Sequence, residues 1–150
     1  MSGSDMPRPS RPLAFAWLGS TIAAALFALV AHVGLIAAMA SPGAASASLQ
    51  VLPSFLLYAV AITGVTMLAL VGIMAFRETG NAPRPLGAWL VAGLLATTPL
   101  ALLGLGLANM GDPVAGAPTF DWRTLLAPLF FYACGLVGAA TAYHIRHRSW

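Results

Sequence analysis

The sequence predicts an all-α integral membrane protein: a four-helix bundle with its N- and C-termini on the cytoplasmic side. Three observations predict it. Hydrophobic residues make up 59% of the 150 residues and charged residues only 7%, whereas a soluble domain carries roughly 25% charged residues. The apolar residues form long runs, and six of the seven arginines would lie on one side of the membrane.

The apolar runs define the predicted helices. Residues 13–76 contain no Asp, Glu, Lys or Arg, but Pro, Gly and Ser interrupt the run at residues 41–50. We therefore expect helices over about residues 13–40, 51–76, 86–110 and 122–145, each long enough for the roughly 20 apolar residues that cross a hydrocarbon core. Residues 1–12 read as a disordered cytoplasmic tail, residues 13–146 as the transmembrane domain, and residues 147–150 as a second cytoplasmic tail.

The arginines set the predicted orientation. With four spans, the positions 8, 11, 77, 84, 146 and 148 fall on one side and only Arg123 falls on the other. Basic residues are enriched in cytoplasmic loops, so we expect both termini in the cytoplasm. The use of Arg without Lys and the high Ala content suggest a GC-rich bacterial genome, and we expect a multi-pass protein of a bacterial inner membrane. Residues 1–40 resemble a secretory signal ending in Ala38-Met39-Ala40, but their apolar run is nearly twice the usual 7–15 residues, and we expect no cleavage.

Small residues predict how the helices associate, because lipid provides no hydrophobic driving force and close packing replaces it. The fourth predicted helix has the best such face, formed by Cys134, Gly135, Gly138, Ala139 and Ala142. Pro99 lies in the middle of the third helix after Thr97 and Thr98, and we expect a static kink there, with the threonine hydroxyls bonding freed carbonyls.

His32 is the one ionisable side chain well inside an apolar run, and an ionisable residue inside a membrane is a functional candidate by default. Three alternatives stand: an interhelical hydrogen bond, which we favour, a place in a proton or ion path, and ligation of a haem or bacteriochlorophyll. The stretch from Ala28 to His32 is similar to that of single-span light-harvesting polypeptides, and this resemblance implies bacteriochlorophyll ligation by the histidine. It covers five residues, and the four-span plan departs from that family.

Polar residues at similar depth predict a shallow vestibule at the outer side, formed by His32, Gln50, Asn109, Asp112, Asp121 and Arg123. His144 and His147 lie one turn apart at the inner end and read as headgroup anchors, since a metal site there lacks an acid nearby in sequence. We expect no resident metal and predict no cofactor beyond the haem or bacteriochlorophyll alternative at His32.

These residues favour three functions in order. The first is a structural or accessory subunit of a larger respiratory or photosynthetic membrane complex, with lipids and other integral membrane subunits as partners and no nucleic acid. The second is a small oligomeric transporter or channel, with Pro99, the threonines and His32 along its path. The third is a pigment- or haem-ligating subunit. The sequence has no phosphate-binding loop, nucleophile elbow or pair of intramembrane acids, so we expect no enzyme.

Overall fold

The computed structural model describes residues 12–39, 50–79, 83–109 and 125–147, and all of its regular structure is helical. Four helices follow one another along the chain: α1 (Leu13–Met39), α3 (Leu52–Glu78), α4 (Leu86–Asn109) and α5 (Leu126–His147). Each is long and apolar enough to cross a membrane, which confirms, among the described residues, the all-helical prediction and the number of helices that could span a membrane.

Two helices run further than we expected. α3 continues through Arg77 to Glu78, and α5 continues to His147, so three polar residues that we assigned to a loop and a tail are helical. Pro residues mark the helix starts: Pro12 and Pro85 accept the first backbone hydrogen bonds of α1 and α4, and Pro53 lies in the first turn of α3. Proline is tolerated at the start of a helix because the first backbone N–H groups have no acceptor within the helix.

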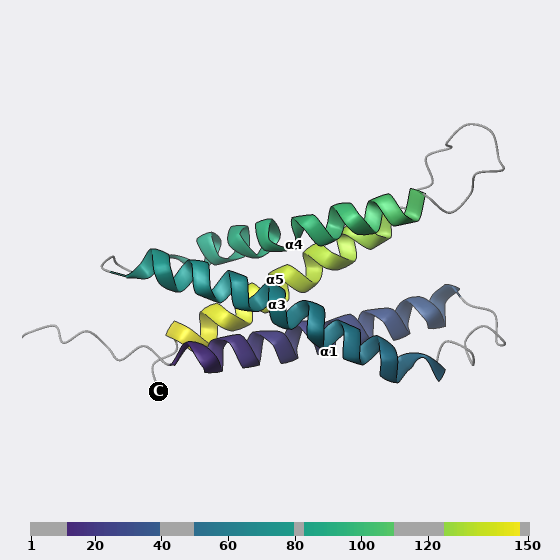
Figure 1. Cartoon of the computed structure of the whole chain (residues 1–150), viewed down its shortest axis with the longest axis horizontal. Coiled ribbons are helices and arrows are strands. Elements are labelled where there is room, and N and C mark those ends of the chain that lie inside the picture. Colours follow the sequence, from purple (N-terminus) through teal and green to yellow (C-terminus); the bar gives the residue numbers. More distant parts are fainter. Residues whose placement is uncertain (1–11, 40–49, 80–82, 110–124, 148–150) are drawn as a thin grey trace, which may run out of the picture.

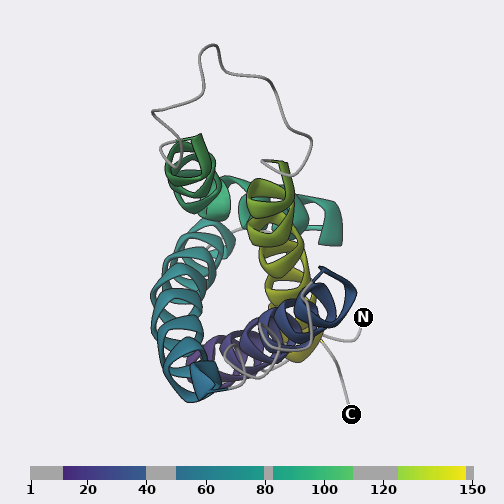
Figure 2. The same ribbon diagram turned by 90° about the vertical axis from the view of Figure 1, so that its right-hand side faces the viewer.

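Successive helices run in opposite directions (Figure 1). One end of the bundle therefore holds the starts of α1 and α4 and the ends of α3 and α5. We call this the Glu78 end and the opposite one the His32 end. Around the bundle axis, α1 lies between α3 and α5, and α4 lies against α5 (Figure 2). α1 and α4 do not contact each other, and α3 contacts α4 far less than it contacts α1.

The closest helix contact joins α4 and α5. A Cβ atom added at Gly93 would lie 2.6 Å from the carbonyl oxygen of Gly135, and one added at Gly135 would lie 2.7 Å from Oγ1 of Thr97. Two backbones can approach this closely only when both helices present small residues. The buried residues of α5 are Cys134, Gly135, Gly138, Ala139 and Ala142, which are the five residues singled out from the sequence as a packing face.

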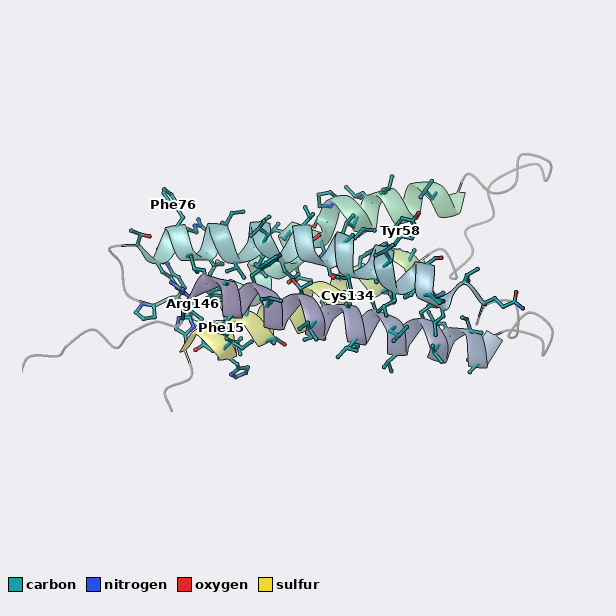
Figure 3. All side chains as sticks on the ribbon, turned by 60° about the horizontal axis from the view of Figure 1, so that its bottom comes forward. Phe15, Tyr58, Phe76, Cys134 and Arg146 are labelled. Atoms are coloured by element: carbon teal, nitrogen blue, oxygen red, sulfur yellow. The ribbon has the colours of Figure 1, made fainter. Side chains whose placement is uncertain are left out.

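The core lies towards the Glu78 end. Its buried residues are Ala16, Met67, Leu70, Val71, Met74, Trp89, Ala139 and Ala142. α1 joins this core through the indole Nε1 of Trp17, which donates to the carbonyl of Gly64 at 2.8 Å. Large apolar side chains cover the outside: Phe76 is 82% exposed and points away from the bundle, whereas Cys134 lies between the helices (Figure 3).

Candidate functional site

The most distinctive side of the bundle is the seam between α3 and α4, where the two helices leave space along their length. Two hollows and one polar cluster lie on this seam. At the Glu78 end is a groove that we name the Ala92 groove, and towards the His32 end is a cavity that we name the Cys134 cavity. The polar cluster surrounds Glu78 and joins the ends of α3, α4 and α5.

The Ala92 groove has a volume of about 440 Å³ and is lined by residues of α3 and α4 alone. On the α4 side it is lined chiefly by small residues, with Ala88, Ala92 and Ala96 spaced four residues apart and Gly87 beside them. Residues four apart lie on the same face of a helix, so these alanines form a strip along the helix axis. On the α3 side it is lined by large side chains, Leu70, Ile73 and Arg77.

This difference in size between the two walls explains why the groove exists. Small residues let two backbones approach closely, but here the large side chains of Leu70 and Ile73 face the alanine strip and hold the backbones apart. The groove is open to the surroundings, because its rim residues Ile73, Val91 and Leu95 are 55%, 57% and 68% exposed. A shape of this kind can receive one face of another helix.

The Cys134 cavity has a volume of about 140 Å³ and touches all four helices. Its lining comprises Ala28, Phe55, Tyr58, Ala59, Ile62, Thr63, Thr66, Met67, Thr97, Leu100, Phe130, Phe131, Cys134 and Gly135.

The threonines of this cavity do not make it polar. The hydroxyls of Thr63 and Thr66 donate to the carbonyls of Ala59 and Ile62 at 2.6 and 2.8 Å, and Thr97 donates to the carbonyl of Gly93 at 2.9 Å. Each donor is therefore used within its own helix, and the methyl groups remain as the apolar part of these side chains. The hydroxyl donors of these three threonines are therefore not free to bind a guest, and most of the remaining lining is aliphatic or aromatic.

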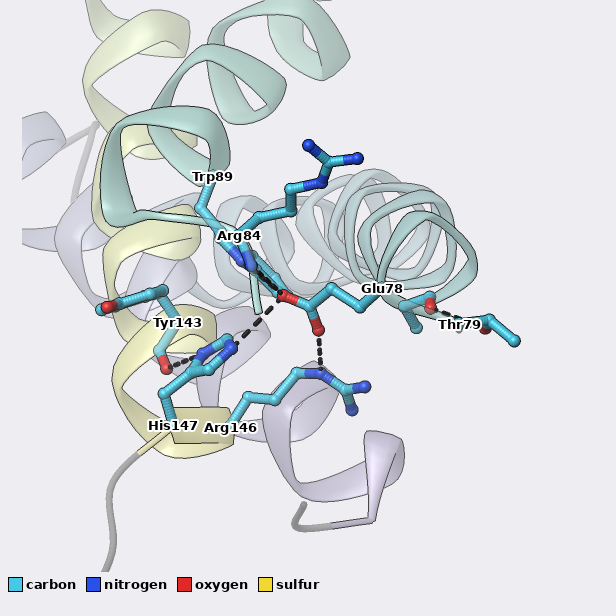
Figure 4. Close-up of polar contacts among 8 residues, drawn as sticks. Glu78, Thr79, Arg84, Trp89, Tyr143, Arg146 and His147 are labelled. Carbon is cyan, nitrogen blue, oxygen red and sulfur yellow. Dashed lines mark hydrogen bonds and ion pairs between the residues drawn. The ribbon is translucent and has the colours of Figure 1, made fainter. Parts of the chain in front are cut away.

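The Glu78 cluster gathers several donors on one carboxylate (Figure 4). Oε2 accepts from Nε of Arg146 at 2.7 Å, and Oε1 accepts from the indole Nε1 of Trp89 at 3.2 Å and from the backbone N–H of Arg84 at 3.3 Å. The Glu78 and Arg146 side chains are only 7% and 12% exposed. This carboxylate thus fastens α3 to both α4 and α5 at one end of the bundle.

His147 completes the cluster. Its Nε2 lies 3.3 Å from Oε1 of Glu78, and its Nδ1 lies 3.0 Å from the carbonyl of Tyr143. Both ring nitrogens therefore lie beside oxygen atoms, one of Glu78 and one of Tyr143. The ring also stacks on Tyr143, with centroids 4.6 Å apart.

The sequence-based reading missed Glu78, which it treated only as part of a polar loop. No acid lies near His144 and His147 in sequence, but Glu78 reaches His147 from another helix. The usable signal was that Glu78 is the only acid between Asp5 and Asp112 and lies on the predicted arginine-rich side. Within the described ranges, no group of three or more His, Cys, Asp or Glu residues is placed to hold a metal ion.

Little of the expected vestibule falls within the described residues. Asp112, Asp121 and Arg123 lie outside them, as does the side chain of Asn109, and Gln50 is exposed. His32 contacts α3 by stacking on Phe55, with ring centroids 4.0 Å apart and an interplanar angle of 11°. That contact is a ring stack and not the interhelical hydrogen bond that we favoured from the sequence.

Pro99 is exposed and lies within a continuous α4. Proline at this position leaves the carbonyl of Leu95 without its usual donor, whereas the Thr97 and Thr98 hydroxyls bond the carbonyls of Gly93 and Leu94. The hydroxyls therefore do not replace the missing bond. Because α1 and α4 do not touch, the structure does not bring Pro99 and His32 together along one path.

Comparisons with protein families, with characterised proteins and with solved structures found no significant match to this chain.

Proposed function

We propose that this chain is a multi-pass protein of the bacterial inner membrane that acts as an accessory subunit of a larger membrane complex, and that it binds a transmembrane helix of its partner in the Ala92 groove. The groove is the observation that carries the proposal. It is open and mainly apolar, with Arg77 as its one charged lining residue, and it presents one small residue per turn of α4 over Ala88, Ala92 and Ala96. Such strips let a second helix approach closely in lipid.

The length of the groove supports a helix as the occupant. From Gly87 to Ala96 the wall extends over about 14 Å at 1.5 Å per residue, which is between two and three helical turns. The exposed Val91 and Leu95 beside the strip provide apolar rims that a partner helix would cover.

The arginines support the orientation. Arg77, Arg84 and Arg146 all lie at the Glu78 end among the described residues, and a cytoplasmic Glu78 end follows from the enrichment of basic residues in cytoplasmic loops. When reporter domains are fused to the N- or C-terminus, a reporter that works only in the cytoplasm should be active, and a reporter that works only outside it should be inactive. A terminal fusion that is active outside the cytoplasmic membrane would contradict this orientation.

Co-purification tests the partner. Tagged protein should be extracted in mild detergent as a complex containing a second integral membrane protein at a fixed ratio. Replacing Ala92→Leu fills the groove and should abolish the complex, whereas Ala14→Leu, at an exposed position of α1 near the same end, should retain it.

Three results would contradict the proposal. One is wild-type protein that purifies alone under the same conditions. Another is equal retention of the partner by the Ala92→Leu and Ala14→Leu variants. The third is loss of the partner from both.

A further inference from the structure

We propose that the Cys134 cavity is a binding site for a single hydrocarbon chain of a membrane lipid. This inference is independent of the partner helix at the Ala92 groove, because the two hollows are lined by different residues. The argument rests on the chemistry of the cavity walls, on its size and on its opening.

The walls exclude polar occupants. The hydroxyls of Thr63, Thr66 and Thr97 are used by carbonyls of their own helices, and the remaining lining is almost entirely aliphatic or aromatic. A buried water needs two to four polar partners, whereas an apolar cavity stays dry and takes apolar guests. The matching occupant is a hydrocarbon.

The size fits part of one chain. A volume of about 140 Å³ is close to that of an engineered apolar cavity, about 150 Å³, that binds benzene. A ring-sized space of this kind accepts a short run of methylene groups and is too small for a lipid with both of its chains.

The cavity borders the exposed surface of α3. Tyr58 and Ile62 line the cavity and are also 67% and 41% exposed, so the cavity reaches the surface along this stripe of α3. α3 packs loosely against both α4 and α5, and this loose side provides the route inward. Further in, the lining residues Met67 and Cys134 are only 1% and 5% exposed.

Photolabelling from within the bilayer tests the proposal. The full chain is reconstituted into nanodiscs of phosphatidylcholine that carries a photoactivatable diazirine in the middle of one acyl chain, and the labelled residues are mapped by mass spectrometry. We expect label at Met67 and Cys134, in addition to label at outward-facing residues such as Val65, which is 72% exposed. Label confined to outward-facing residues would overturn the proposal.

Two variants sharpen this result. Ala59→Phe fills the cavity and should abolish label at Met67 and Cys134 without loss at Val65, whereas Ala61→Phe, on the exposed surface of the same helix, should leave the pattern unchanged. Internal label that persists in Ala59→Phe would contradict the proposed site.

Thr66→Val separates a hydrocarbon from a polar occupant. It removes a hydroxyl that bonds only its own helix, so the label at Met67 should persist. Its loss would contradict a purely apolar site. If Ala59→Phe does not fold, the wild-type map together with Thr66→Val still decides the question.

Discussion

The α4–α5 seam and the α3–α4 seam use the same kind of residue to opposite effect. At α4–α5, Gly93 faces Gly135 and Ala139, and the two backbones meet. At α3–α4, the alanine strip of α4 faces Leu70 and Ile73, and the helices stay apart. At α4–α5, small residues on both helices let the backbones approach closely, whereas at α3–α4 the large side chains that face the alanine strip keep the helices apart.

The two seams also differ in what holds them. The α4–α5 contact is a close backbone approach, in which Gly93 and Thr97 of α4 meet Gly135 and Ala139 of α5. On the α3–α4 side, the carboxylate of Glu78 accepts from the indole of Trp89 in α4 and from the backbone N–H of Arg84 just before α4. Added side-chain volume at the α4–α5 seam should therefore lower the stability of the protein, and so should the loss of polar contacts at the α3–α4 seam.

The largest effect is expected at the close seam. Gly135→Ala places a methyl group 2.8 Å from the carbonyl oxygen of Gly93, and overpacking of this kind costs about 2–3 kcal/mol. The measurement is reversible unfolding in mixed detergent micelles.

The matched control is Gly72→Ala, because a Cβ at Gly72 meets no atom within 4 Å. It should stabilise the protein by about 0.5 kcal/mol, because alanine loses less backbone entropy than glycine in a helix. Equal effects of the two substitutions would remove the contrast between the seams.

A smaller effect is expected at the Glu78 cluster. Glu78→Ala removes the acceptor for Arg146 and for the buried indole of Trp89, and hydrogen bonds to charged groups contribute about 1.5–3 kcal/mol. We expect a loss at the low end of this range in the same unfolding assay, because one end of the bundle retains its short α3–α4 connection.

Glu78→Gln separates charge from hydrogen bonding. The amide oxygen can still accept from Trp89, whereas the ionic contact with Arg146 is lost, so the loss of stability should be smaller than for Glu78→Ala. If both variants are as stable as the wild type, the Glu78 carboxylate does not hold α3 against α4 and α5.

The sequence predicted the features that depend on composition and local spacing. Long uncharged runs separated by Pro, Gly and polar residues define four helices, and small residues at four-residue spacing identify the buried face of α5. These patterns need no knowledge of which helices are neighbours.

The features of the α3–α4 seam were not predictable from the sequence in this way. Glu78 meets Arg146 across 68 positions of the chain, and the Ala92 groove exists because of the large residues that happen to face Ala88, Ala92 and Ala96. Both features depend on helix neighbours and rotation, which uniformly apolar helices do not specify through an amphipathic pattern.

Site-specific photo-cross-linking in cells tests the central claim most directly. A benzophenone amino acid is placed at Leu95, on the rim of the Ala92 groove, or at Ile22, on the outward face of α1. The two positions are matched, because Leu95 and Ile22 are 68% and 54% exposed and each is the tenth residue of its helix. The account predicts a discrete adduct with another integral membrane protein from Leu95 and none from Ile22. The same adduct from both positions, or lipid adducts alone from Leu95, would contradict it.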